Sequence, residues 1–234
     1  YCQDLHDAIM ADSSCLDDFL LILGGDHSLS IGTVNAINKI QKNKTGVVWV
    51  DAHADVNTSE TSPSANVHGM SLAFLLGLEK ALLQQQQWSW FHPCGLQSSD
   101  VVYVGLRDVD DGEKDIIKAL GITVFTVDDI DEQGIDSVMD QVQKKLAHKE
   151  NLHLSFDIDV LDPKVVPHTG THATGGLTEE EGLYVCEALG GTGRLTSMEL
   201  VEVNPIIEQH VPVEQTLDIA MRLINKTLTS AREA

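Results

Sequence analysis

Residues 19–55 read FLLILGGDHSLSIGTVNAINKIQKNKTGVVWVDAHAD, and this stretch decides the fold. The apolar run at 19–23 predicts a strand, the segment from 28 to about 41 predicts a helix, and the run at 47–50 predicts a second strand. A strand, a helix and a second strand in this order are typical of the crossover that joins two parallel strands. The stretch therefore predicts an α/β fold built on a parallel sheet.

The same alternation continues to the end of the chain. Further strands are predicted at residues 100–105, 122–127, 152–156 and 195–201, and further helices at 69–83, 113–120, 135–147, 179–189 and 213–228. The strand-like runs are rich in Val and Ile without clean alternation, which indicates strands buried on both faces. Right-handed crossovers would place helices on both faces of the sheet. We therefore expect a three-layer α/β/α sandwich with a mostly parallel central sheet, formed as one domain.

The composition argues against several classes of protein. The 234 residues include 36 Asp and Glu but only 15 Lys and Arg, which gives a formal net charge of −21. A chain this acidic repels phosphate backbones and anionic lipids, so we predict no nucleic-acid partner and no membrane partner. The four cysteines form no C-x-x-C pair, which favours reduced thiols in an intracellular compartment. The charge suits a protein that binds cations, either metals or a positively charged substrate.

Polar and titratable residues follow five of the predicted strands. They lie at 24–28, 51–55, 107–110, 157–159 and 202–205. Because ligands bind outside the carboxyl ends of parallel strands, we expect these residues to converge at that edge of the sheet. Each motif alone has a structural explanation, such as a helix cap or a turn. Together they bring like charges to one place, which is unfavourable unless cations lie among them.

Six side chains of this set have the chemistry of metal ligands. Alternate residues of Asp-x-His-x-Asp and Asp-x-Asp point the same way in extended backbone, so each motif can present several ligands to one site. Four carboxylates and two imidazoles would hold two divalent ions, and they are His27, Asp51, His53, Asp55, Asp157 and Asp159. An oxygen-rich set with some imidazole and no thiolate favours Mn²⁺ over Zn²⁺ or copper. The pattern therefore predicts a site for two Mn²⁺ ions per chain.

Three motifs in this order resemble the signatures of the ureohydrolase family, which includes the arginases and the agmatinases. They are GGDHS at 24–28, DAHAD at 51–55 and SFDIDVLDP at 155–163. The segments at 51–70, 105–110, 167–178 and 202–205 are similar to arginase rather than agmatinase sequences. The resemblance implies a three-layer α/β/α fold that assembles as a homotrimer or hexamer. It also implies hydrolysis of L-arginine to L-ornithine and urea, in which a hydroxide bridging two Mn²⁺ ions attacks the guanidinium carbon.

The resemblance bears on the extent of the chain and on its location. The family's chain extends further on the N-terminal side, and this sequence begins with Tyr1. We therefore expect residues 1–234 to be a single arginase-like catalytic domain that lacks its N-terminal part. Residence in the cytoplasm is expected, with the mitochondrion as the alternative.

The resemblance also implies roles for individual residues. The six side chains named above would be the metal ligands. Asp55 would pass a proton to the departing amine, His68 would shuttle protons to solvent, and Glu202 would pair with the guanidinium. The residues implied in substrate binding are Asn57, Ser64 and Asn66 at the α-carboxylate, Asp110 and Glu113 at the α-ammonium, and Thr171 and Glu202 at the guanidinium end.

Three positions depart from the family pattern. Ala65 replaces a common glycine, and Asp111 and His172 each replace a proline. None of these changes removes a predicted metal ligand. Ala65 would tighten the loop that holds the α-carboxylate and so alter the KM for the substrate.

Three other functions are consistent with parts of this pattern. A ureohydrolase that acts on agmatine or guanidinobutyrate would use the same metals. A single-metal hydrolase of deacetylase-like architecture would leave several carboxylates of the six-ligand set uncompensated. A non-enzymatic homologue that keeps the fold as a binding or scaffold protein typically loses ligands, whereas all six are present in this sequence.

Overall fold

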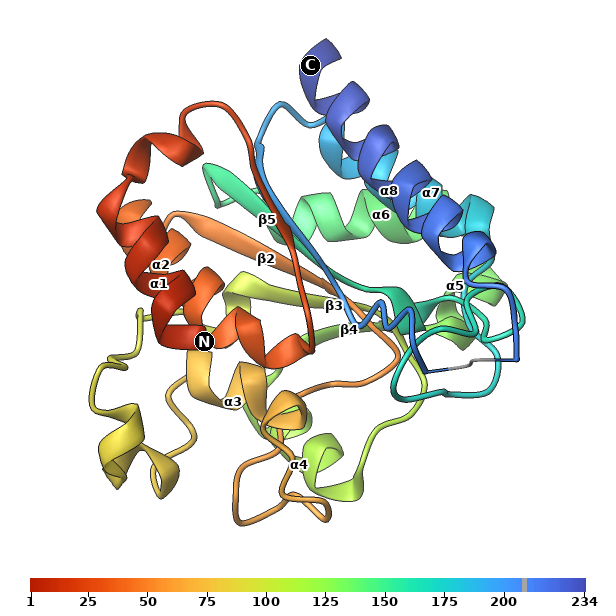
Figure 1. Cartoon of the computed structure of the whole chain (residues 1–234). Helices are drawn as coiled ribbons and strands as arrows, with labels where there is room; N and C mark the ends of the chain where they lie inside the picture. The colour runs from red at the N-terminus through yellow and green to blue at the C-terminus, as the bar shows by residue number, and fades with distance from the viewer. Residues whose placement is uncertain (208–209) are drawn as a thin grey trace.

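The computed structural model describes residues 1–207 and 210–234 (Figure 1). Within them, a six-stranded sheet runs in the order β1-β6-β5-β2-β3-β4, and its neighbouring strands pair in parallel. The strands are β1 (Leu20–Leu23), β2 (Thr45–Val50), β3 (Val101–Leu106), β4 (Thr123–Thr126), β5 (Asn151–Asp157) and β6 (Leu195–Val201). The predicted α/β fold with a parallel central sheet is therefore confirmed.

Helices flank this sheet on both sides (Figure 1). They are α1 (Cys2–Ala11), α2 (Ser30–Ile40), α3 (Ser71–Leu75), α4 (Asp111–Leu120), α5 (Val127–Gln133), α6 (Ile135–Lys145), α7 (Glu179–Gly190) and α8 (Glu214–Glu233). Alternate residues of β2 belong to different apolar cores. Val48 and Val50 share a core with residues of α6, α7 and α8, whereas Val47 and Trp49 share one with residues of α2 and α3. Every residue of β2 is buried, as expected for a strand covered on both faces.

The predicted helix at 69–83 is much shorter in the structure. Helix α3 covers only Ser71–Leu75. It ends because Gly77 adopts a left-handed φ of +71°, which lets the backbone N–H of Leu78 donate to the carbonyl oxygen of Ala73 at 2.8 Å. The rest of the predicted range forms a loop with short 3₁₀ turns.

Two helices have no counterpart in the sequence prediction. Helix α1 precedes the stretch from which the fold was deduced, and α5 begins where the strand predicted at 122–127 was expected to end. Strand β4 stops at Thr126, whose hydroxyl accepts the backbone N–H of Asp129 at 3.1 Å and so caps the first turn of α5. Val127 therefore begins a helix instead of ending a strand.

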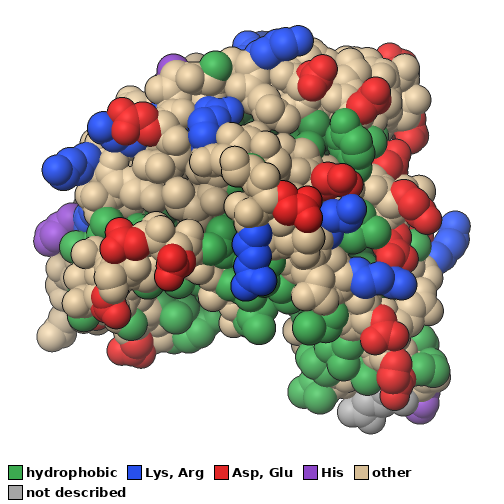
Figure 2. Space-filling model, turned by 90° about the horizontal axis from the view of Figure 1, so that it is seen from above, with side chains coloured by type: hydrophobic (Ala, Val, Ile, Leu, Met, Phe, Trp, Pro, Cys, Tyr) green, Lys and Arg blue, Asp and Glu red, His purple; other side chains and the backbone are tan. Residues whose placement is uncertain are grey.

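The surface is acidic, and several large hydrophobic side chains are exposed on it. Strand β1 lies at an edge of the sheet, and its Leu23 is 67% exposed. Ile206, Ile207 and Val211, which precede α8, are also exposed. Figure 2 shows hydrophobic side chains near that segment on a face over which Asp and Glu are scattered. None of the helices in the described part of the chain combines the length and the apolar character needed to cross a bilayer.

Candidate metal centre

The six predicted ligands come from three strand ends at the carboxyl edge of the sheet. His27 follows β1, three of the others follow β2, and the last two lie at and just beyond the end of β5. The structure brings five of them into two overlapping groups, which are His27 with Asp51 and Asp55, and Asp51 with His53 and Asp159, while the sixth, Asp157, lies with its Oδ2 3.2 Å from His27 Nδ1. In each group the potential ligand atoms all lie within 4.8 Å of one another. The role of these residues as metal ligands remains a prediction.

The surroundings of His27 fit a metal ion better than a hydrogen bond. Its Nδ1 atom lies 2.9 Å from Asp51 Oδ2 and 3.2 Å from both Asp55 Oδ2 and Asp157 Oδ2. This buried nitrogen has no hydrogen-bond partner of suitable geometry, whereas Nε2 lies 2.8 Å from Ser155 Oγ. An imidazole that carries its proton on Nε2 directs a lone pair from Nδ1 towards the three carboxylates. A divalent cation among them would use that lone pair.

Asp51 joins the two groups from a fully buried position. Its Oδ1 lies 3.5 Å from His53 Nδ1 and accepts the backbone N–H of His53 at 2.7 Å. Asp159 Oδ2 lies 3.1 Å from the same His53 nitrogen. On the other side, Trp49 Nε1 donates to Asp51 Oδ2 at 3.0 Å. One carboxylate therefore faces both imidazoles, which is the position expected of a ligand shared by two ions.

Two residues of the site hold a backbone conformation that side chains disfavour. Asp55 has a φ of +50° and Glu202 a φ of +62°. Conformations of this kind cost roughly 1 kcal/mol or more, and they persist where the surrounding structure holds them. Here the carbonyl of Asp55 accepts the N–H of Leu72 at 2.8 Å, and the N–H of Glu202 donates to the carbonyl of Gly25 at 2.9 Å. Such strained residues cluster at functional sites, which supports a functional role for this edge of the sheet.

Burial and close contact shift the pKa values of the cluster strongly. Burial alone would lower the pKa of His27, but the contacts with Asp51 and Asp55 outweigh it and raise that pKa to about 9. Burial would likewise lower the pKa of His53, but Asp159 and Asp51 raise it to about 12. Burial, together with the charge of Asp51, raises the pKa of Asp55 well above its ordinary value. Protons thus supply the positive charge that the carboxylates need, and two divalent ions would displace them.

A cavity of about 450 Å³ opens above this cluster. It is lined by every predicted catalytic and substrate-binding residue, namely Asp55, Asn57, Ser64, Asn66, His68, Asp110, Glu113, Thr171 and Glu202. Among the described residues that form its lining there is no Lys or Arg. An acidic cavity of this kind attracts a cationic ligand.

Glu202 and His68 lie close to each other in the lining of the cavity. Glu202 Oε1 accepts the backbone N–H of His27 at 2.8 Å, which fixes the carboxylate beside the cluster. His68 Nδ1 lies 3.9 Å from the same oxygen, and its side chain is 36% exposed. Burial raises the pKa of Glu202. The positions suit a carboxylate that faces a cation and an imidazole that reaches solvent, although both roles remain predictions.

The residues predicted to bind the amino-acid end of a substrate are held differently from one another. Asn57 is buried, and its Nδ2 donates to Asp110 Oδ2 at 2.9 Å. Ser64 and Asn66 are exposed at the rim of the cavity. The two carboxylate oxygens of Glu113 accept backbone N–H groups at 3.1 and 3.0 Å, so this side chain caps α4 and holds the preceding loop. We therefore expect Asp110 rather than Glu113 to contact an α-ammonium group directly.

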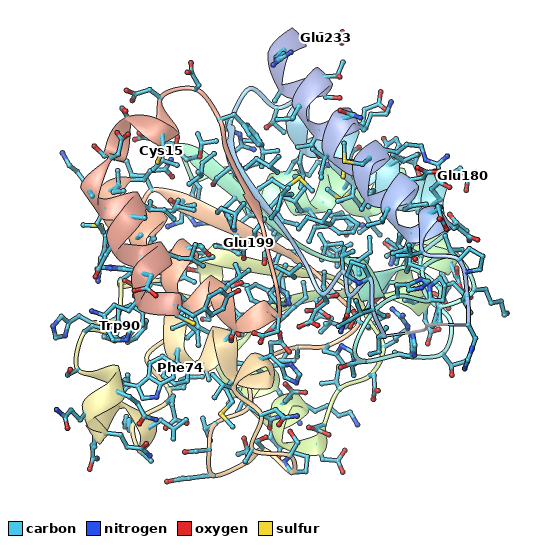
Figure 3. The ribbon with its side chains drawn as sticks, viewed as in Figure 1. Cys15, Phe74, Trp90, Glu180, Glu199 and Glu233 are labelled. Atoms are coloured by element: carbon cyan, nitrogen blue, oxygen red, sulfur yellow. The ribbon has the colours of Figure 1, made fainter. Side chains whose placement is uncertain are left out.

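Three polar residues support the centre, although the sequence prediction gave them no role of their own. Ser155 Oγ, which faces His27, donates to Glu199 Oε1 at 2.6 Å, and Glu199 lies fully buried on β6 (Figure 3). The contact orients the serine hydroxyl so that its oxygen accepts a hydrogen bond from the Nε2–H group of His27. Arg107 donates to the backbone carbonyl of Asp159 at 2.7 Å. For Glu199 the available signal is its charge within a strand that carries no other charged residue.

Comparison with known proteins gives a consistent result. The model of the arginase family matches residues 2–229. The chain is 47% identical over 193 residues to an arginase of Neurospora crassa, a match that covers 80% of this chain and 54% of that protein. The chain therefore spans about half the length of this relative.

Solved structures of arginases have the same fold as this chain. The arginase of Bacillus cereus superposes with a TM-score of 0.87 at 38% identity, over 97% of this chain and 76% of that one. The arginase of Entamoeba histolytica, solved in complex with L-ornithine, superposes with a TM-score of 0.87 at 36% identity, over 97% of this chain and 75% of that one.

Proposed function

The chain belongs to the arginase family, and from that premise we propose that it hydrolyses L-arginine to L-ornithine and urea. The observation that carries the proposal is the pair of His–Asp groups that share Asp51 at the floor of an acidic cavity. The Entamoeba relative binds L-ornithine, which is the amino-acid product of this reaction. A guanidinium keeps its positive charge at every working pH, so a cavity lined by carboxylates suits it.

We propose that the centre holds two Mn²⁺ ions. The set of four carboxylates and two imidazoles without thiolate favours Mn²⁺ over Zn²⁺ or copper. The unpaired Nδ1 of His27, with three carboxylate oxygens within 3.2 Å, is the atom that most clearly requires a cation. When bound, the two ions would lower the pKa of a water molecule so that it attacks carbon near neutral pH.

The residues of the chain orient the substrate and move its protons. Glu202, fixed by the N–H of His27, would pair with the guanidinium and hold its central carbon above the cluster. A new carbon–oxygen bond forms as the bond from that carbon to the Nε atom of arginine breaks. Asp55 would accept a proton from the attacking water and deliver it to the departing Nε atom, which leaves L-ornithine neutral at that amine. His68, partly exposed at the cavity wall, would exchange protons with solvent between turnovers.

The amino-acid end of the substrate decides between an arginase and an agmatinase. Agmatine has the same guanidinium but lacks the α-carboxylate, so only groups at the far end of the cavity distinguish the two substrates. Asn57, Ser64 and Asn66 would donate hydrogen bonds to that carboxylate, and Asp110 would accept from the α-ammonium. These donors lose their partner when agmatine binds. Sites of this kind reject an analogue by up to roughly 10⁴-fold, and an exposed rim reduces this.

The test compares the two substrates on the full-length protein loaded with Mn²⁺. We expect kcat/KM for L-arginine to exceed that for agmatine by at least about two orders of magnitude. Similar hydrolysis of both, or a preference for agmatine, would contradict the arginase proposal and leave a ureohydrolase. Absence of hydrolysis in a preparation that holds two ions per chain would support the non-enzymatic alternative. Binding of only one ion, with full activity, would support a single-metal hydrolase.

We further propose that the protein is a homo-oligomer, as a trimer or hexamer, and that it works in the cytoplasm. Both proposals rest on the resemblance to the family. Light scattering of the purified full-length protein and imaging of its tagged form in cells would test them.

A further inference from the structure

A buried carboxylate outside the cavity lining lies on a loop that the sequence prediction assigned to a helix. Glu79 is 1% exposed and follows the turn that ends α3. Its Oε2 accepts the backbone N–H of Ser59 at 2.6 Å. Its Oε1 accepts the hydroxyl of Ser59 at 3.1 Å and the backbone N–H of Leu82 at 2.8 Å. Within residues 1–207 and 210–234, no Lys, Arg or His lies within ion-pair distance of this carboxylate.

A buried carboxylate without a cationic partner is costly to keep. Transfer of a charged group out of water is unfavourable unless hydrogen bonds to the charged form compensate for the loss. At Glu79 these bonds come mainly from backbone N–H groups, and they outweigh burial and lower the pKa of the side chain. The carboxylate is therefore tied to the conformation of the two backbone segments that donate to it, at Ser59 and at Leu82.

Ser59 belongs to the substrate loop, which we define as residues 57–66. The loop begins with a turn in which the N–H of Thr61 donates to the carbonyl of Thr58 at 3.1 Å. The hydroxyl of Thr61 accepts the N–H of Thr58 at 2.9 Å and donates to Asn57 Oδ1 at 2.9 Å. The turn that Glu79 holds is thus bonded to the side chain of Asn57. Asn57 is the buried member of the three residues predicted to bind the α-carboxylate.

We propose that Glu79 is a positioning residue for substrate recognition, because it fixes the turn at 58–61 that sets the orientation of the Asn57 side chain. The inference rests on the proposed function, since it takes the α-carboxylate of L-arginine as the group that Asn57 binds. In the described residues Glu79 makes its side-chain hydrogen bonds with Ser59 and Leu82 and none with a predicted metal ligand, so its influence concerns binding of the amino-acid end. It contributes to KM and to the preference for L-arginine over agmatine.

Glu79→Gln is the sharpest test, because the two backbone N–H groups bond to different oxygens. Glutamine has one acceptor oxygen, so its NH₂ group must face either the N–H of Ser59 or that of Leu82. One partly buried donor is left unpaired, which changes an equilibrium by roughly tenfold. We expect KM for L-arginine to rise about tenfold while kcat stays within about twofold. Manganese content should remain equal to that of the unmodified protein.

Two measurements besides L-arginine kinetics make this test specific. Amide hydrogen exchange at residues 58–66 in the Mn²⁺-loaded, substrate-free protein should become faster in Glu79→Gln. The kcat/KM for agmatine should stay within about twofold, because agmatine has no carboxylate for Asn57. Glu60→Gln is the matched control, since Glu60 is exposed in the same loop and should change none of these values. Ser59→Ala removes one of the three bonds and should give a smaller effect of the same kind.

The outcomes separate this inference from the proposed function. If the unmodified protein hydrolyses L-arginine and Glu79→Gln has the same KM and the same exchange rates, the positioning role is wrong. A fall in kcat with unchanged KM, or a loss of manganese, would equally overturn it. If Glu79→Gln does not fold, Ser59→Ala is measured in its place. A raised KM for L-arginine with nearly unchanged kcat supports the positioning role, and an unchanged KM contradicts it. If the unmodified protein shows no hydrolysis, the proposed function fails, and unchanged exchange at 58–66 would still reject control of the loop by Glu79.

Discussion

The metal side of the cavity and the substrate loop are held in place by different means. The predicted metal ligands lie on strand ends, and Asp51 and Asp157 are 0% and 2% exposed. Parallel pairing of the strands puts them together, so their position follows from the topology of the sheet. The substrate loop is mostly exposed, and side chains of neighbouring segments hold its first part: Glu79 beyond α3 holds Ser59, and Glu113 of α4 holds Val56, the residue just before the loop. The sheet thus positions the chemistry, while loop contacts position the groups that select the substrate.

Asp51→Asn is expected to have the largest effect, because one carboxylate serves both groups of the centre. The amide keeps the size of the side chain but removes the charge that faces both imidazoles. Changes in residues that merely orient ligands already cost about 10–100-fold in metal affinity, so loss of this carboxylate should exceed about 100-fold. Metal analysis after dialysis should find fewer than two ions per chain, with activity lost in parallel.

Asp110→Asn is the matched control on the other side of the cavity. The same chemical change there removes the predicted acceptor for the α-ammonium and weakens the contact with Asn57. Metal content should stay at two ions per chain while KM for L-arginine rises. If Asp110→Asn loses metal, or if Asp51→Asn keeps both ions, the two regions are not independent in the way that their structures indicate.

The metal side of the cavity is easier to predict from the sequence than the substrate loop. The reason is that the topology of the sheet positions the metal side, whereas loop contacts position the substrate loop. Motifs such as DAHAD follow apolar runs that form buried parallel strands, and the convergence of their side chains requires only the sheet topology. The helix predicted at 69–83 ends at Leu75 because the left-handed Gly77 turns the chain, which an apolar pattern does not reveal. Glu79 lies beyond that turn, and its burial depends on a contact twenty residues away with Ser59. A glutamate in a loop carries no sequence signal for such a contact.

The buried carboxylate of Glu199 was missed for a related reason. The apolar residues around it identify β6 as a strand, but they do not indicate what a single charged side chain would meet inside. Its partners come from α2 and β5, including Thr33 and Ser155, and only the folded chain brings them together. The motif pattern thus leads to the candidate ligands themselves, while the residues that orient them depend on tertiary packing.

Removal of the metal should make the free energy of unfolding depend on pH. Only groups on the metal side of the cavity should cause this dependence. In the metal-free protein the pKa of His27 is about 9, against an ordinary value of 6.5. A raised pKa stabilises the fold fully below pH 6.5, and this contribution is lost as the pH rises through about 9. The raised pKa of Asp55 acts in the same direction. The metal-free protein should therefore become less stable as the pH rises over this range.

Bound Mn²⁺ reverses this dependence, because metals bind histidine without its proton. The difference in melting temperature between Mn²⁺-loaded and chelated protein should widen by several degrees from pH 6.5 to pH 9. Thermal unfolding of both forms across this range measures it. Glu60→Gln, on the substrate loop, should leave the widening unchanged. A constant or narrowing difference would mean that the histidines do not carry these protons in the metal-free fold.

The smallest effect is expected at Ala65, on the exposed rim of the substrate loop. Its φ of +59° lies in the left-handed region, where a side chain costs roughly 1 kcal/mol or more that glycine avoids. Glycine also gains freedom in the unfolded chain, which offsets about 0.4–1 kcal/mol of this. We therefore expect Ala65→Gly to raise the free energy of unfolding by less than about 1 kcal/mol. Ala119→Gly, at an exposed position of α4, should instead lower it by roughly 0.5–1 kcal/mol.

Urea unfolding of Ala65→Gly and Ala119→Gly in parallel measures this difference in sign. The KM for L-arginine should also rise slightly in Ala65→Gly, because a more flexible backbone at 65 lets Ser64 and Asn66 leave the rim positions that they occupy in the cavity lining. This rise should be smaller than in Glu79→Gln, since no buried hydrogen bond is lost. If Ala65→Gly destabilises the fold as much as Ala119→Gly does, the left-handed backbone at 65 is not maintained in solution. The rim of the loop would then take its shape from the bound substrate instead of from the contacts that hold its first turn.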